Sequence, residues 1–160
     1  MKRFIPIFII LFISCSYGAD EELESGLIDT VQESTYAITE TSFKYIDTTE
    51  AVVTENFTDK KTIIIFWADY WGVCRRELPV VEKELANISD EYDVIALAHS
   101  QYEPTMEWVN ENLNGNLTIG FSTPELRDYF KIVGQPISIV LDTNGEIISR
   151  TYGEIDLTNF

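Results

Sequence analysis

The first half of the chain contains two kinds of apolar pattern, continuous runs and a helical repeat. Continuous β-branched and aromatic runs at Thr62–Trp67 and Val94–Ala98 predict two strands that are buried on both faces. Between these runs, apolar residues recur at the helical spacing, which predicts an amphipathic helix along Leu78, Val81, Leu85 and Ile88. Pro79 lies within this predicted helix and should kink it.

The second half of the chain predicts two more helices. Pro104 should open the first of them, with an apolar face formed by Met106, Val109 and Leu113. Thr123-Pro124-Glu125 has the features of a helix start, because proline occupies the first helical position and an acid follows. The predicted buried face of this last helix consists of Leu126, Phe130 and Val133.

Turn residues and short apolar runs predict the remaining strands. Asn144-Gly145 between Ile137–Leu141 and Glu146–Thr151 is a strong hairpin signal. Leu117–Phe121 should be a short strand or an extended link, and a first hairpin is expected around Asp47-Thr48-Thr49. An alternation of strands and helices that ends in a hairpin predicts an α/β fold with a central mixed sheet flanked by helices on both faces.

The N-terminus has the pattern of an export signal. Two basic residues precede a short apolar run, and small residues follow, so residues 1–18 are interpreted as a signal peptide. Either a secretory peptidase removes it, or it is a lipoprotein signal in which Cys15 is lipidated. Residues 19–41 are acidic and rich in Ser and Thr, which is typical of a poorly ordered tether, and residues 42–160 form the predicted domain.

Charge and cysteine content exclude several functions. The chain has 27 acidic and 11 basic residues, giving a net charge of −16, and such a field repels nucleic acids and anionic lipid. We therefore expect no nucleic-acid partner, and membrane association only through a lipid anchor. If Cys15 is removed or lipidated, Cys74 is the single thiol of the domain, and no internal disulfide can form.

The stretch Phe66–Pro79 reads FWADYWGVCRRELP and resembles the active-site segment of TlpA/ResA-type thioredoxin-like proteins, Phe-Trp-Ala-x-Trp-Cys-x-Pro-Cys-x-x-Glu-x-Pro. Val133–Pro136 resembles the segment that holds the cis-proline of that fold, and Leu141–Ile147 resembles the hairpin after it. The resemblance implies a thioredoxin fold, an extracytoplasmic location, periplasmic, membrane-anchored or secreted, and redox handling of thiols and disulfides of proteins or small molecules. It also implies a last helix, of which residues 156–160 could form only the first turn, so either this helix is short or missing or the sequence is a fragment.

The motif departs from the family where the chemistry is most demanding. Trp71 occupies the place of the nucleophilic first cysteine, and Val73 and Tyr70 replace the usual Pro and Trp. The resemblance leaves Cys74 as the candidate catalytic thiol and Glu77 as its candidate proton-exchange partner. A two-cysteine cycle needs a first thiolate that attacks and a second thiol that resolves, so this chain should be unable to run one.

Three functions remain open from these residues. The first is a degenerate thiol–disulfide oxidoreductase that uses Cys74, and the second is a non-redox module that binds an extended peptide along Trp71, Gln135 and Pro136. The third is a one-cysteine peroxidase similar to the peroxiredoxins. Cys74 is equally compatible with an inert buried thiol. A lone His99 beside one cysteine is too little for zinc, and we expect no metal, no cofactor and a monomer.

Overall fold

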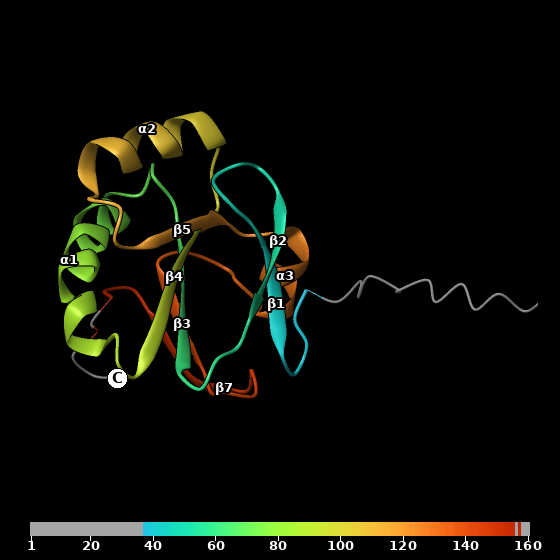
Figure 1. Ribbon diagram of the computed structural model, residues 1–160. Helices are drawn as coiled ribbons and strands as arrows, with labels where there is room; N and C mark the ends of the chain where they lie inside the picture. Colours follow the sequence, from blue (N-terminus) through green and yellow to red (C-terminus); the bar gives the residue numbers. More distant parts are fainter. Residues whose placement is uncertain (1–36, 156, 158–160) are drawn as a thin grey trace, which may run out of the picture. The chain divides into compact units, whose positions relative to one another are not determined.

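A computed structural model describes residues 37–155 and 157, which form a seven-stranded mixed sheet in the order β2-β1-β5-β4-β3-β6-β7 (Figure 1). The strands are β1 (Ser42–Ile46), β2 (Val52–Asn56), β3 (Lys61–Trp67), β4 (Tyr92–Ala98), β5 (Thr118–Phe121), β6 (Ile137–Leu141) and β7 (Ile147–Tyr152). Strand β3 pairs parallel with β4 and antiparallel with β6, and β6 and β7 form the predicted second hairpin. The predicted mixed α/β sheet is confirmed.

Helices cover both faces of this sheet. Helices α1 (Gly72–Ile88) and α2 (Tyr102–Asn112) lie on one side of β3 and β4, and the short α3 (Pro124–Tyr129) lies on the other (Figure 1). Ile63 and Ile65 of β3 belong to the core under α1 and α2, whereas Ile64 and Phe66 belong to the core under α3. This alternation explains why the sequence of β3 is continuously apolar, because every position meets one core or the other.

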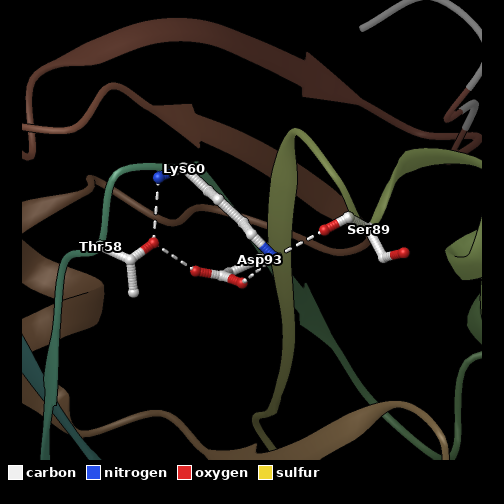
Figure 2. Close-up of polar contacts among 4 residues, drawn as sticks. All are labelled: Thr58, Lys60, Ser89 and Asp93. Atoms are coloured by element: carbon white, nitrogen blue, oxygen red, sulfur yellow. Dashed lines mark hydrogen bonds and ion pairs between the residues drawn. The ribbon is translucent and has the colours of Figure 1, made fainter.

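A polar cluster fixes the C-terminal end of α1 at the sheet edge where β3 and β4 begin. The ammonium group of Lys60 donates to the carbonyl oxygen of Ser89, at 2.7 Å, and lies 3.9 Å from the Asp93 carboxylate (Figure 2). Thr58 completes the cluster by donating its hydroxyl to Asp93, at 2.8 Å. A cation at a helix C-terminus is favourable because the last carbonyls carry partial negative charge. The cluster ties the C-terminal end of α1 to the start of β4.

Several local predictions need correction. Val133 is 85% exposed and does not belong to the buried face of α3, because that helix ends at Tyr129 and Lys131 takes a positive φ of 53°. Helix α2 begins at Tyr102, two residues before Pro104, since the first helical turn needs no amide hydrogen from proline. The second hairpin has a loop at residues 142–146, longer than two residues, and Gly145 takes a φ of 78° within it.

Part of the segment interpreted as a tether belongs to the domain. Ile38 is buried and forms a β-bridge with Phe43, and Thr41 accepts a hydrogen bond from the Phe57 amide at 2.8 Å. The packed chain therefore includes residues 37–41. Residues 19–36 and the predicted signal segment 1–18, with Cys15, lie outside the described residues.

After β7, the described residues cross to the face covered by α1. Ile155 and Leu157 are buried in the same core as Leu78 and Val81. No α-helix is assigned to residues 153–155, and Leu157 is in a 3-10 conformation, so the expectation of a short or missing last helix stays a prediction. None of the helices in the described part of the chain combines the length and the hydropathy that a membrane crossing requires.

Candidate functional site

The Trp-Gly-Val-Cys turn lies between the end of β3 and the start of α1. The Trp71 amide donates to the carbonyl oxygen of Ala68 at 3.1 Å, and the Trp71 carbonyl accepts from the Arg75 amide at 3.2 Å. Trp71 is thus the residue that precedes the helix, and no side chain caps the free amides there. Its indole is 48% exposed. The position that carries the nucleophile in the resembled family therefore presents an aromatic surface.

Cys74 is the third residue of α1 and is completely buried. Its thiol belongs to the core that contains Trp67, Leu78 and Ala98. Burial raises the pKa of Cys74 above its usual value of 9.0, and the charge of Glu77 raises it further, whereas backbone hydrogen bonds of Ala68 and Cys74 act in the opposite direction. Because only a thiolate attacks a disulfide or a peroxide, this environment disfavours the reactive form of the sulfur.

The cis-proline segment lies beside this turn. The Gln135–Pro136 bond is cis, as predicted, and Pro136 is buried immediately before β6. The register of β6 on β3 pairs Ile137 with Phe66, so Pro136 lies at the sheet edge where the motif follows β3. A hydrogen bond from Gln135 Nε2 to the Tyr70 hydroxyl, 3.0 Å long, joins the two segments directly.

An exposed apolar surface surrounds that hydrogen bond. Tyr70 is 62% exposed, Trp71 follows it in the chain and is 48% exposed, and Val133, 85% exposed, lies two residues before Gln135. The backbone N–H and C=O of Gln135 form no hydrogen bond with any described residue. We call Tyr70, Trp71, Val133 and Gln135 the motif surface. It combines apolar side chains with free backbone groups, which is what an extended chain needs to dock.

A cavity of about 540 Å³ lies next to the motif on its α2 side. It is lined by Asp69, Tyr70, His99, Ser100, Gln101 and Pro104. The Thr105 hydroxyl, which is buried, lies within hydrogen-bond distance of the Asp69 carboxylate at 3.2 Å and of the Ser100 hydroxyl at 2.8 Å. These bonds fix the loop before the motif against the start of α2.

The other residues singled out in the sequence have ordinary positions. Glu77 is half-buried in the second turn of α1, and its charge acts on the Cys74 thiol. Arg76 is exposed and donates to the Gly72 carbonyl oxygen, at 3.1 Å, and the guanidinium of Arg75 lies 5.8 Å from the centre of the Trp108 ring. His99 follows β4 at the same edge as the motif. In the described part of the chain, no group of three or more His, Cys, Asp or Glu residues is placed to hold a metal ion.

Glu82 is a polar residue of α1 that the sequence analysis did not single out. Its buried carboxylate accepts hydrogen bonds from three backbone amides of the loop before β5 and from one side-chain amide, at 2.8–3.4 Å. The donors are the amides of Asn114, Asn116 and Leu117 and the Asn114 side chain. The signal was present in the spacing, because Glu82 follows Leu78 by one helical turn and therefore lies on the apolar face.

Comparison with known proteins identifies the fold. No protein-family model matches the sequence, and no curated protein matches it significantly. Solved structures do match, among them MTB dsbF in mixed oxidised and reduced forms, with a TM-score of 0.64 and 20% identity over 75% of this chain and 90% of that one. The thioredoxin domain of a thiol-disulfide oxidoreductase from Bacteroides vulgatus matches with a TM-score of 0.63 and 21% identity, over 78% of this chain and 93% of its own.

A third match is described as an exposed lipoprotein thioredoxin from Streptococcus pneumoniae. It has a TM-score of 0.62 and 18% identity, over 72% of this chain and 91% of its own. These three structures share the strand and helix arrangement described above. The domain therefore has an α/β thioredoxin-like fold with a mixed seven-stranded sheet.

Proposed function

We propose that this protein is a non-redox thioredoxin-fold module that binds an extended peptide outside the cytoplasm, on a scaffold shared with thiol–disulfide oxidoreductases. The observation that carries the proposal is the state of Cys74, the only candidate thiol of the domain. It is completely buried, and its pKa is raised by that burial. A thiolate is the attacking species in disulfide exchange, so a thiol held neutral in a core is poorly suited to that work.

The replacement of the first cysteine by Trp71 supports the same proposal. An indole neither attacks a disulfide nor carries electrons in thiol exchange, and its position at the start of α1 is the exposed one. The chemistry of the scaffold is lost at both positions of the motif, because the accessible residue has no thiol and the thiol is inaccessible. The cis Gln135–Pro136 bond lies beside the motif and is the feature that we propose a bound peptide uses.

The motif surface offers what a bound chain would use. The free backbone groups of Gln135 can pair with an extended peptide, and Tyr70, Trp71 and Val133 provide exposed apolar area beside them. Strand-like pairing supplies affinity and neighbouring side chains supply selectivity in this mode of recognition. Because the chain carries a net charge of −16, we expect the bound peptide to be basic as well as apolar.

The location follows from the predicted signal sequence. We propose that the chain is exported, and that it is either secreted or anchored through a lipid on Cys15. One structure of the same fold is described as an exposed lipoprotein, which supports an envelope location for the scaffold. Mass spectrometry of the N-terminal peptide from the native source distinguishes a lipidated Cys15 from a cleaved signal.

Peptide binding can be measured with fluorescently labelled peptides that are unstructured, basic and free of cysteine. We expect saturable binding that Val133→Asp weakens by about tenfold or more, because it places a charge on the motif surface. Val52→Asp is the matched control, since Val52 is also exposed but lies on β2. Cys74→Ser should leave affinity unchanged. Absence of binding, or equal losses in the two valine variants, would refute the proposal.

A single-thiol oxidoreductase is the second candidate function. The observation in its favour is that backbone hydrogen bonds of Ala68 and Cys74 lower the pKa of the thiol, against the larger effect of burial. This second candidate requires that local opening at the start of α1 exposes the Cys74 sulfur to a substrate. An external thiol would then complete each turnover.

Insulin reduction driven by dithiothreitol separates the two candidates. We expect the natural chain to give no rate above the reagent alone, because it has no intramolecular resolving step. Trp71→Cys should produce a rate at least about tenfold above that background, since Cys74 and Glu77 are in place to resolve the mixed disulfide. Activity of the natural chain that Cys74→Ser abolishes would favour the single-thiol enzyme.

A further inference from the structure

A second cavity, of about 300 Å³, opens where β4 and β5 end. Its walls come from five elements and include Ile46, Glu50, His99, Tyr102, Phe121 and Arg127. None of the motif-surface residues lines it, but it shares His99 and Ser100 with the larger cavity beside the motif. Its volume is at the lower end of the range for pockets that hold small molecules, which suits a ligand of about amino-acid size.

Arg127 provides the positive charge of this cavity. Its guanidinium is anchored by Ser122, donating to the carbonyl oxygen and, at 3.0 Å, to the hydroxyl of that residue. No carboxylate of the described residues lies within ion-pair distance of it. A guanidinium has five N–H donors in a planar fork, so an anchored and unpaired arginine keeps donors for an incoming carboxylate.

Glu50 provides the negative charge; its side chain is exposed, and the turn between β1 and β2 fixes its backbone. The Asp47 carboxylate closes this turn by accepting from the amides of Thr49 and Ala51, at 2.7 and 3.2 Å. Glu50 itself takes a φ of 63°, a left-handed conformation that is rare for a residue of its size. Its carboxylate has no partner among the described residues. The cavity thus carries one acid and one base that do not pair with each other.

The remaining wall is neutral and partly apolar. The Tyr102 hydroxyl donates to the Thr48 carbonyl oxygen at 2.6 Å, and the rings of Tyr102 and Phe121 lie 5.4 Å apart. Burial and the nearby Arg127 charge both lower the pKa of His99. An imidazole that is neutral at neutral pH adds a hydrogen-bonding group without a further charge.

We propose that this cavity binds a small zwitterion, a molecule of amino-acid size with one carboxylate and one ammonium group. The carboxylate pairs with Arg127 and the ammonium group with Glu50, while an aliphatic side chain packs against Tyr102 and Phe121. A simple anion would leave Glu50 unpaired beside it, and a simple cation would leave Arg127 unpaired. The complementary charges therefore select a ligand that carries both.

Three probes of nearly equal shape test this selection. L-leucine carries both charged groups, 4-methylpentanoate lacks the ammonium group, and 3-methylbutylamine lacks the carboxylate. Each is titrated into the full chain while the amide signals of His99 and Ser122 are followed by NMR. We expect saturable shifts with leucine and an affinity for either of the other probes that is weaker by at least about tenfold.

Charge-neutral variants then assign the two contacts. Arg127→Gln should abolish the response to leucine, and Glu50→Gln should weaken leucine by about tenfold while improving 4-methylpentanoate. Lys83→Gln and Glu111→Gln are the matched controls, because they remove the same charges from exposed positions that do not line the cavity. Thermal melts verify that each variant folds.

Two results would overturn the proposal. One is the absence of saturable shifts with leucine up to about 50 mM. That concentration would detect even binding much weaker than proteins ordinarily show for metabolites. The other is an equal response to leucine and 4-methylpentanoate that Glu50→Gln does not change, which would indicate a plain carboxylate site. Both results are independent of whether the motif surface binds peptides.

Discussion

Cys74 and Glu82 lie two helical turns apart on α1, and both are buried, yet burial has opposite consequences for their pKa values. The Cys74 thiol lies among apolar side chains, and its pKa is raised because removal from water disfavours the charged form. Burial also acts to raise the pKa of Glu82, but the hydrogen bonds from Asn114, Asn116 and Leu117 outweigh it, and the net shift is downward.

The difference shows that hydrogen-bond donors, and not depth alone, decide which form of a buried acid is stable. Glu82 is kept charged because its oxygens meet donors that would otherwise be unpaired, so carboxylate and loop satisfy each other. Cys74 has too few donors to offset the loss of water. The helix therefore has a buried carboxylate with a lowered pKa in its third turn and a buried thiol with a raised pKa in its first.

Removal of the Glu82 carboxylate should give the largest change in stability. We expect Glu82→Ala to lower the free energy of unfolding by about 3 kcal/mol, because the buried Leu117 amide would lose its acceptor and the part-buried amides of Asn114 and Asn116 would lose a charged one. Glu82→Gln should cost about 1–2 kcal/mol, since one acceptor oxygen remains. Urea denaturation of both variants gives these values.

Glu84→Gln is the matched control on the same helix. Its carboxylate accepts only an exposed bond from Asn87, and the change should stay within about 0.5 kcal/mol. A loss below about 1 kcal/mol in Glu82→Ala would contradict the comparison, because the loop would then not depend on the carboxylate.

The difference in stability between the natural chain and Glu82→Gln should also depend on pH, and this smaller effect tests the same comparison. The folded pKa of Glu82 is below the usual value of 4.5, so its stabilising contribution is fully present above that value. It is lost as the pH falls through the folded pKa, since the carboxylate must then be protonated in the native state. The stability gap between the natural chain and Glu82→Gln should thus be constant near neutrality and shrink below about pH 4.5. A gap that persists unchanged to about pH 3 would contradict this assignment.

The sequence predicted the arrangement of elements well because apolar spacing and turn residues are local signals. Strand β3, helix α1 and the hairpin at Asn144-Gly145 could each be recognised without knowledge of the rest of the chain. The exposure of Val133 could not be predicted in this way, because it depends on the end of α3 at Tyr129 and on the turn at Lys131. Helical spacing alone continued that helix too far.

The candidate site was predicted only in part, for a physical reason. The sequence placed Trp71, Cys74 and Pro136 in one region, and the register of β6 on β3 agrees with that placement. The bond between Tyr70 and Gln135, the anchoring of Arg127 by Ser122 and the donors around Glu82 join residues distant in the chain or depend on side-chain direction. Such contacts leave no periodic trace in a sequence. The roles of Cys74 and Glu77 stay predictions.

The alkylation rate of Cys74 as a function of pH tests the central claim most directly. Iodoacetamide labelling of the full chain, followed by mass spectrometry of the peptide containing Cys74, keeps Cys15 out of the measurement. We expect the native thiol to react at least about a hundredfold more slowly than the same thiol in urea, with a rate still rising above about pH 9. A native rate that equals or exceeds the unfolded rate and levels off near or below about pH 7 would show a reactive thiolate and contradict the non-redox account.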